Sequence, residues 1–209
     1  MAWQDLLDSE ILPGKPPKSS IFFRLRDNLV AVAQRRVGAP VVQVPVTVVL
    51  TGSGNWAIPD GVTAWEETLV GAGGGYVPAG PNATATTTTY NAVVVSAGGG
   101  AQKPGGSTVG GAGGVATGGD LNINGEAGTP SASLTAGLML GGRAAQWSFP
   151  PLNTALTVAA GYGAGASAAG GGGFCIKRRV RVGGFPTVAY SVGVGGAGGG
   201  APGILIIRY

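Results

Sequence analysis

The sequence has no histidine, one cysteine and only two methionines among its 209 residues. Without histidine the chain can build neither a Ser-His-Asp triad nor a Cys-His pair, and it lacks the commonest metal ligand. A single cysteine excludes an internal disulfide bond and a zinc site made of cysteines. We therefore expect no cofactor and no metal site.

Charge is also scarce, because Asp, Glu, Lys and Arg make up 11% of the chain where about 25% is typical. The formal net charge of +4 is too small to indicate a nucleic-acid partner. No apolar run is long enough to span a bilayer, and the opening residues lack a signal-peptide pattern. We expect neither nucleic-acid binding nor membrane insertion.

Glycine, in contrast, occupies 42 positions, about three times its usual share. Its distribution is uneven, since residues 1–36 contain a single glycine and ten of the charged residues. The composition changes close to Val37-Gly38-Ala39-Pro40. The chain therefore divides into an N-terminal docking segment, 1–40, and a glycine-rich domain, 41–209.

The first segment is predicted to be helical. Apolar residues recur at near-helical spacing after Pro16-Pro17 and stop before Gly38. A helix of about 18 residues cannot form a core alone, so its apolar face must bury against the rest of the chain or another protein. A helix lying on a membrane surface is the alternative. The predicted docking residues are Trp3, Leu6, Ile21, Phe22, Leu25, Leu29 and Val32.

The glycine-rich part contains strand-like runs of β-branched and aromatic residues, which a disordered chain would lack. These runs are 46–50, 62–70, 84–96, 147–149, 156–158, 174–182, 187–194 and 204–207. The sequence thus predicts a mainly β, sandwich-like domain.

The glycine runs between these strands are open to two interpretations, polyglycine segments packed backbone to backbone or ordinary loops. Each ordered glycine costs ~0.5–1 kcal/mol relative to alanine, which favours self-association or very close packing. Collagen is excluded because the glycines keep no strict period of three. The runs are 73–75, 98–100, 170–173 and 198–200.

Several ordered motifs carry a family resemblance. TGSGNWAIPDGVT, 51–63, leads on to the glycine run at 71–76, and GGAGGGAPGILIIRY, 195–209, closes the sequence. With LPGKP at 12–16, these motifs resemble the glycine-rich domain of tailed-bacteriophage tail fibres and adhesins. The resemblance covers most of the chain and departs at Glu66-Glu67, where the family strand usually alternates apolar residues.

The resemblance implies a virion protein of the tail tip or tail fibre, commonly a homotrimer. Such a protein attaches to other tail or baseplate proteins and binds a bacterial surface structure such as lipopolysaccharide or pili. A purely structural component that braces other tail proteins is the alternative. A silk-like or cell-wall glycine-rich protein is a second alternative.

Five residues are candidate receptor contacts. Lys177, Arg179 and Arg181 share one face of a predicted strand, and a basic stripe of about 13 Å could bind phosphates. Protection of a sheet edge is the alternative role. Tyr76 and Tyr162 adjoin glycine runs and either stack on sugar rings or pack inside the domain.

Two acidic motifs are weaker candidates for chemistry. Asp120, Asn122 and Asn124 match half of a calcium-binding EF-hand loop, but Ser131 stands where the bidentate glutamate is required, so a β alternation ending in a turn is favoured. Glu66 and Glu67 point to opposite faces of a strand. Because nothing brings two carboxylates together for glycoside hydrolysis, we expect no enzyme activity.

Overall fold

The computed structural model describes residues 19–33, 45–76, 81–102, 110–129, 142–144, 161–166 and 168–209. The chain divides into two compact units, Met1–Pro45 and Val46–Tyr209. In the first unit the described residues form one helix, α1 (Ser19–Ala33), and in the second they form ten strands. Trp3, Leu6 and the predicted strands 147–149 and 156–158 lie outside the described residues.

Helix α1 has two apolar faces that differ in exposure. Ile21 and Ala31 lie on a buried face together with Asn28. Phe22, Leu25 and Leu29 lie on the neighbouring face and are exposed. Among the predicted docking residues, only these three present described, exposed side chains, since Ile21 is buried and the side chain of Val32 is not described.

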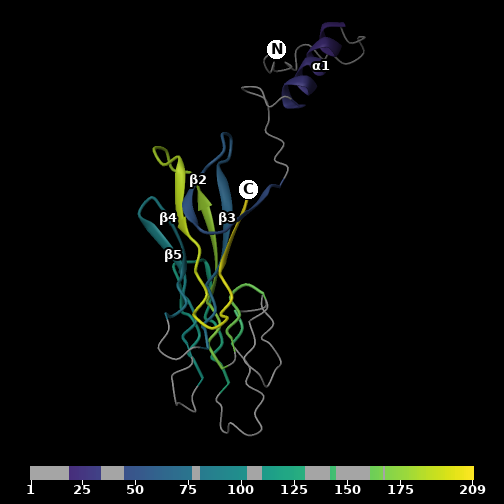
Figure 1. Cartoon of the computed structure of the whole chain (residues 1–209). Coiled ribbons are helices and arrows are strands. Elements are labelled where there is room, and N and C mark those ends of the chain that lie inside the picture. The colour runs from purple at the N-terminus through teal and green to yellow at the C-terminus, as the bar shows by residue number, and fades with distance from the viewer. Residues whose placement is uncertain are drawn as a thin grey trace. The chain divides into compact units, whose positions relative to one another are not determined.

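The second unit contains two antiparallel sheets of five strands each, so the mainly β fold is confirmed (Figure 1). The first sheet has the order β1 (Thr47–Leu50), β10 (Ile204–Arg208), β3 (Ala64–Val70), β8 (Phe174–Val180), β7 (Leu121–Ile123). The second has the order β2 (Ser53–Ala57), β9 (Thr187–Ser191), β4 (Thr86–Tyr90), β5 (Val93–Ala97), β6 (Ala116–Thr117).

The two sheets share one hydrophobic core. Leu69 and Leu205 of the first sheet and Val95 and Val188 of the second belong to the same fully buried cluster. An aromatic chain crosses between the sheets, because the Trp65 ring lies edge-on to Trp56 at 5.8 Å and to Tyr90 at 4.9 Å between centroids. The strand residues that alternate inward therefore supply the core, as expected for strands with a period of two.

The first sheet also buries part of its outer face, at the end where β3 ends and β8 and β10 begin. Val70, Phe174, Ile204 and Ile206 form a second cluster there, and Ala144 packs against them. A strand buried on both faces reads as a continuous apolar run. This accounts for the sequence of β10, ILIIR, in which every residue but the arginine is buried.

One expected strand is in fact a hairpin. The run 84–96 was expected to be a single strand, but it forms β4 and β5 joined by a turn at Asn91-Ala92. Both turn residues have positive φ, 47° and 61°. Two-residue hairpin turns with positive φ at both positions match the twist of the strands, and asparagine tolerates that conformation well.

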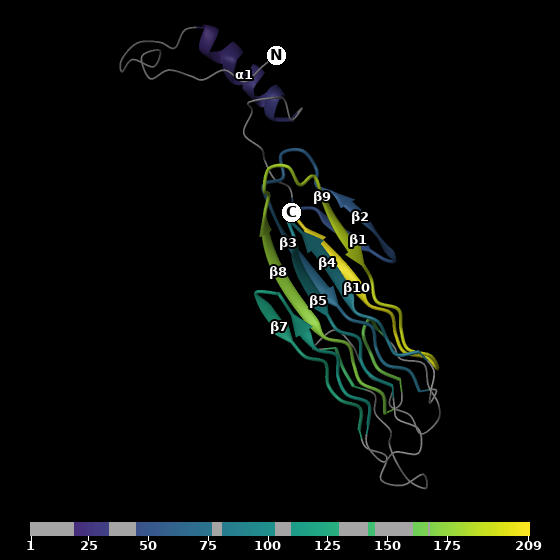
Figure 2. The same cartoon turned by 90° about the vertical axis from the view of Figure 1, so that its left-hand side faces the viewer.

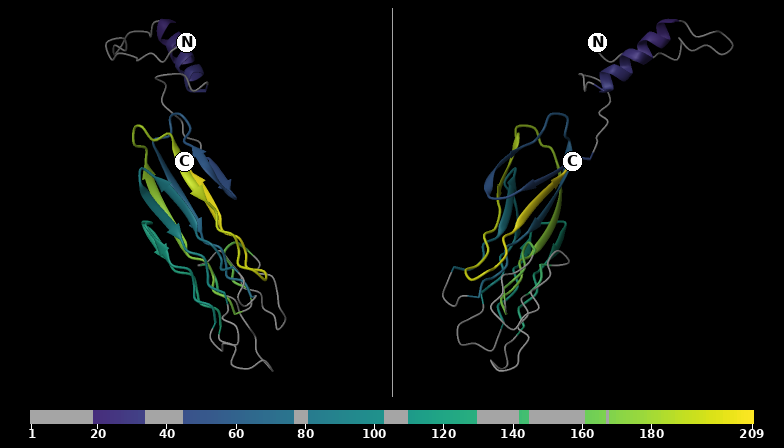
Figure 3. Two further views of the ribbon diagram at one scale, coloured as in Figure 1. Left: turned by 60° about the vertical axis from the view of Figure 1, so that its left-hand side comes forward. Right: turned by 45° about the vertical axis from the view of Figure 1, so that its right-hand side comes forward.

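All strands except β1 and β2 continue at one end of the sheets into extended segments, most of them rich in glycine (Figures 1 and 2). The C-terminus lies toward the other end, where Val46 and Tyr209 exchange backbone hydrogen bonds of 2.8 and 3.1 Å (Figure 3). We call these extended segments the glycine bundle; they are 71–76, 81–85, 98–102, 110–115, 124–129, 142–144, 161–166, 168–173 and 192–203.

Candidate functional site

The glycine bundle is organised around a central segment, residues 168–173, which hydrogen-bonds through its backbone to six neighbours. The N–H groups of Gly170 and Gly173 donate to one neighbour, through Ala101 and Gly98. The bonding direction therefore repeats every third residue. The six neighbours contribute Gly71 and Gly74, Gly98 and Ala101, Gly111 and Gly114, Glu126, Gly142, and Gly163.

A second segment, 71–74, is surrounded in the same way. Gly71 and Gly74 both donate to the first central segment, at Gly173 and Gly170, and are again three residues apart. Its other partners are Thr84, Gly100 and Ala166 of three further segments, and Gly196 and Ala201, which lie on the two arms of 192–203 before and after the turn at 197–199. With these arms counted separately, each centre has six neighbours, the number around each rod in hexagonal packing.

Only glycine allows the segments to approach this closely. At Gly73, Gly100, Gly170 and Gly172, an added Cβ would lie within 3.0 Å of a backbone carbonyl oxygen of a neighbouring segment. At Gly183, in the loop after β8, an added Cβ would meet nothing within 4 Å. Backbone contact therefore requires glycine at these positions of the bundle, whereas no such contact requires it at Gly183.

At the perimeter of the bundle, side chains point outward at every third position. In segment 110–115, Gly111 and Gly114 are buried, whereas Ala112 and Val115 are exposed. Three residues separate the members of each pair, which is the same period as the hydrogen bonds. In the adjacent segment Asn124 and Ala127 are exposed as well, but so is Glu126, so the period of three is not regular there.

The predicted basic stripe is not continuous at the surface, because its middle residue, Arg179, points into the core. Lys177 and Arg179 do share a face of β8, but it is the face that carries Cys175 into the core between the sheets. The Arg179 side chain is 4% exposed. Arg179 is therefore not available at the surface for a receptor, and the three basic residues do not form a continuous surface patch.

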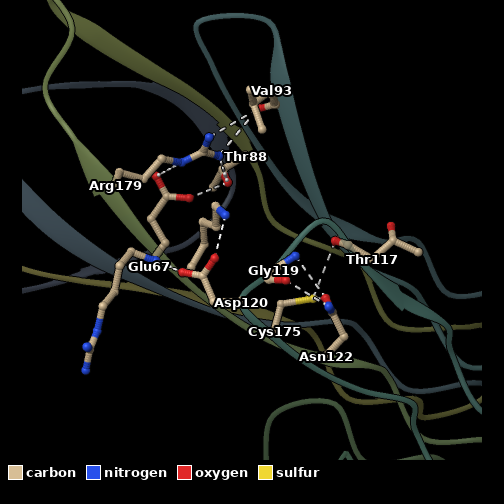
Figure 4. Close-up of polar contacts among 11 residues, drawn as sticks. Glu67, Thr88, Val93, Thr117, Gly119, Asp120, Asn122, Cys175 and Arg179 are labelled. Carbon is tan, nitrogen blue, oxygen red and sulfur yellow. Dashed lines mark hydrogen bonds and ion pairs between the residues drawn. The ribbon is translucent and has the colours of Figure 1, made fainter.

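Arg179 belongs instead to a buried network that links the two sheets (Figure 4). Its Nε donates to Oε1 of Glu67 at 3.1 Å, and its terminal nitrogens donate to the Val93 carbonyl at 3.3 and 3.4 Å. Glu67, which is fully buried, also accepts from Trp65 Nε1 at 2.8 Å and from Thr88 Oγ1 at 2.6 Å. Both charges are thus compensated within the core.

The other two basic residues of the predicted stripe are also engaged. Lys177 Nζ lies 2.5 Å from Asp120 Oδ1, and the other Asp120 oxygen accepts from the Arg178 N–H at 2.8 Å. The Lys177 hydrogen bond, followed by the Arg178 N–H, lowers the pKa of Asp120. Arg181 donates to the Pro59 carbonyl at 3.2 Å.

The two candidate tyrosines lie at different levels of the glycine bundle. Tyr162 is 40% exposed, and its neighbour Gly163 donates to the Pro202 carbonyl, close to the start of β10. Tyr76 is partly buried and ends the segment that runs away from β3. The structure therefore does not bring these tyrosines together, nor does it place either beside Arg179.

The residues of the half EF-hand motif stabilise a turn. Asn122 Oδ1 accepts from the Gly119 N–H at 2.9 Å and from the Cys175 thiol at 3.4 Å (Figure 4). Asn124 Oδ1 accepts from the Ala116 N–H at 3.0 Å. Burial raises the pKa of the Cys175 thiol. Across the described ranges, no three His, Cys, Asp or Glu side chains gather as a possible metal site.

Glu66 and Glu67 point to opposite faces of β3, as the alternation predicts. Glu66 pairs with Arg178 and Arg208 at 3.3 and 3.4 Å on the outer face, whereas Glu67 faces the core. Both carboxylates are therefore held in ion pairs.

None of the described helices has the length and apolarity to span a membrane.

No protein-family model matches the chain, and no similar curated protein or solved structure was found. The resemblance drawn from residues 51–76 and 195–209 therefore stays a prediction. Function must be argued from the geometry of the glycine bundle and from the exposed surfaces.

Proposed function

We propose that this chain is a virion protein of a phage tail tip or tail fibre that attaches the phage to a bacterial surface by non-covalent binding, without bond chemistry. The observation that carries the proposal is the glycine bundle. Because each central segment is bonded to six neighbours, the glycine bundle forms a rigid extension of the two sheets. Such a rigid support suits a protein whose function is to present a binding surface to another structure.

The proposal includes a finer description of the second unit, a β-sandwich whose glycine bundle consists of polyglycine helices. A polyproline-II-type helix has three residues per turn and no internal hydrogen bonds. Both properties match the period of three and the bonds from Gly170 and Gly173 to another segment. At about 3.1 Å per residue, the segment 168–173 spans about 16 Å.

We place receptor binding at the end of the glycine bundle remote from the sheets, where Tyr76, Gln102 and Thr129 are the last described residues of three segments. Lipopolysaccharide or pili are the surface structures we propose. Exposed Tyr162 is a further contact. The N-terminal segment docks on other tail or baseplate proteins, with three copies per assembly.

A purely structural role in the baseplate or fibre is the second candidate. The exposed apolar residues of α1, Phe22, Leu25 and Leu29, favour it, because they indicate docking on protein whether or not a receptor is bound. This candidate predicts incorporation into phage particles without any binding of the isolated chain to cells.

The experiment is a cell-binding assay with the fluorescently labelled full chain on a panel of Gram-negative strains. On any strain that binds, excess unlabelled chain should protect cells from adsorption of phages that infect it. Replacing Tyr76 and Tyr162 by serine should abolish binding, whereas Thr89→Ala on the outer face of β4 should preserve it.

The proposal is overturned if the replaced variant binds as well as the parent. Binding to none of the strains, combined with recovery of the chain in purified particles, would instead establish the structural role. Circular dichroism melts of all variants check that the two sheets remain folded.

A further inference from the structure

The outer face of the second sheet, which points away from the core, carries no charge. None of the five strands of this sheet contains Asp, Glu, Lys or Arg. The first sheet differs, because its outer face holds Glu66 between Arg178 and Arg208. Charged residues are normally among those that a sheet exposes to water. Solvation alone therefore does not account for the uncharged outer face.

One line across this face consists only of hydroxyl side chains. The strand register aligns one such residue from each of β2, β9, β4, β5 and β6 in turn. We call these five residues the hydroxyl row; they are Ser53, Ser191, Thr87, Ser96 and Thr117. With about 4.8 Å between neighbouring strands, the row is about 19 Å long. It crosses the whole sheet from one edge strand to the other.

The hydroxyl groups of the row are accessible and mostly unpaired. Ser53, Ser191 and Thr117 are exposed. Thr87 and Ser96 are partly exposed. The side-chain oxygens of Ser53 and Ser191 lie 3.0 Å apart, whereas the hydroxyls of Thr87, Ser96 and Thr117 have no hydrogen-bond partner within the described residues. Because a hydroxyl group donates one hydrogen bond and accepts two, the row can bind donors and acceptors alike.

The neighbouring row on the same face does not obstruct the hydroxyl row. It lies two residues further along each strand and consists of Asn55, Ala189, Thr89 and Val94. All four side chains are short and uncharged, and all four are exposed. Neither a bulky group nor a charge therefore borders the hydroxyl row on that side.

The composition of the face argues against a protein or an anion as its partner. Protein interfaces are enriched in aromatic residues, Met and Arg and depleted of Ser and Ala. The aromatic residues of these strands, Trp56, Tyr90 and Tyr190, pack toward the core instead. Phosphates and carboxylates are bound best by Arg and Lys, which these strands lack.

The twist of a sheet argues against a flat crystalline partner. Neighbouring strands are rotated by about 20°, so the side chains of the hydroxyl row fan through about 80° from β2 to β6. A flat lattice would contact only part of the row, whereas a single flexible chain can follow it. The fitting partner is thus an uncharged polymer that donates and accepts hydrogen bonds at regular intervals.

An uncharged polysaccharide has these properties, because every sugar unit carries hydroxyl groups and is about as long as the distance between two strands. We propose that the hydroxyl row binds an uncharged polysaccharide chain, which lies across the strands with successive sugar units over successive strands. This inference goes beyond the proposed function by giving the second unit another binding surface. It rests on that function only in assigning the polysaccharide to the bacterial surface.

The test is native electrophoresis of the full chain through gels that contain dextran, galactomannan or hydroxyethylcellulose. Because the row offers no aromatic ring for stacking, we expect weak binding, which this method detects. At least one of these uncharged polymers should retard the chain. Dextran sulfate should retard it less, at about 0.15 M salt, which screens charges more than about 8 Å apart. Retardation by none of the uncharged polymers, or only by dextran sulfate, overturns the inference.

Substitutions that remove only the hydroxyl groups locate the binding. Thr87→Val with Thr117→Val should weaken binding at least about tenfold, because two hydrogen bonds to the ligand are lost. Thr87→Ser with Thr117→Ser keeps both hydroxyl groups and should bind like the parent. The matched control is Thr187→Val, which lies on the same face but about 13 Å along β9 from Ser191. Unchanged binding of the double valine variant, or an equal loss in the control, overturns the inference.

A second pair of substitutions tests the other end of the row. Ser53→Ala with Ser191→Ala should weaken binding as well, and this pair decides the question if the double valine variant does not fold. Circular dichroism melts of all variants measure folding. Full binding by the double alanine variant would contradict a ligand that spans the row.

Cell binding separates this inference from the proposed function. If both hold, the double valine variant still binds cells, but more weakly than the parent, because the contact of the row adds to the receptor contact. A parent chain that binds an uncharged polymer but no strain refutes the proposed function alone. A parent chain that binds cells but no uncharged polymer refutes the hydroxyl row alone.

Discussion

The strand half and the glycine bundle of the second unit exclude water in opposite ways. In the strand half, side chains such as Leu69, Leu205 and Val188 fill the space between sheets, which normally lie about 10 Å apart. In the bundle, backbones touch directly, and the segments at Gly73 or Gly170 leave no room even for a methyl group. Stability in the first half thus depends on what the side chains are, and in the second on their absence.

The largest expected effect comes from adding a side chain at a centre of the bundle. Gly170→Val would place its side chain against the Ala112 carbonyl, and the six surrounding segments cannot all shift to make room. We expect a loss of about 5 kcal/mol or more in the free energy of unfolding, at the upper end for single substitutions. Chemical denaturation measures this loss.

The matched control is Gly183→Ala, where the added group meets nothing and the change should stay within about 0.5 kcal/mol. If Gly170→Val is as stable as the parent chain, the backbone-packed bundle is not the native arrangement.

The second prediction tests the buried ion pair of the strand half, Glu67 with Arg179. Arg179→Met would leave the Glu67 carboxylate buried without its ion-pair partner, which costs about 3–5 kcal/mol. Adding Glu67→Gln should recover much of this loss, because no buried charge then remains. Thermal melts of both variants measure these changes in stability. The control is Arg178→Met, because the Arg178 side chain is 82% exposed. This substitution is expected to change the stability by less than about 1 kcal/mol.

The third prediction compares the two halves directly by removing side-chain atoms. Leu69→Ala should cost about 3 kcal/mol, since it opens a cavity in a close-packed core. Ala169→Gly, at a fully buried bundle position, removes one methyl group and should cost only about 1 kcal/mol. Equal losses in urea denaturation would show that the bundle also depends on a side-chain core.

The smallest effect concerns pH at the edge of the strand half. The pKa of Asp120 is lowered in the folded chain by Lys177 and the Arg178 N–H, so its contribution to stability is present above the pKa of the unfolded chain, about 3.9. That contribution disappears as the pH falls through the lower folded pKa. Asp120→Asn should therefore destabilise the chain at pH 6 and hardly at pH 2.5.

Denaturation of parent and variant across this range measures the difference. Lys177→Met should reproduce the same pH dependence, because it removes the first cause of the lowered pKa. A difference between parent and Asp120→Asn that stays constant down to pH 2 would contradict the assignment.

Much of the strand half could be predicted from sequence because side-chain type reports burial. The runs ILIIR and AWEETLV, both with β-branched or aromatic residues, gave β10 and β3 almost at their observed bounds. The role of Arg179 was missed, although Glu67 lies two residues from Trp65 and two from Leu69 and so shares their inward face. That spacing was the available signal for a buried ion pair.

The glycine bundle could be predicted only in composition. A glycine carries no side chain that indicates which neighbour it faces, so nothing in the sequence selects 168–173 and 71–74 as the two centres. Their selection depends on hydrogen bonds between segments that lie more than a hundred residues apart, such as Gly71 to Gly173. The outward positions Ala112 and Val115 carry the period of three, but over too few residues to be recognised in advance.

The arrangement of hydrogen bonds in the bundle has a mechanical consequence. A β-sheet is stiff within its plane and bends easily across it, because its bonds lie in one layer. Around 168–173 the bonds radiate in several directions, repeating every third residue, so that no axis of easy bending remains. The two central segments continue into β3 and β8. A sideways force on the end of the glycine bundle remote from the sheets would therefore be transmitted to these two strands and would bend the bundle itself very little.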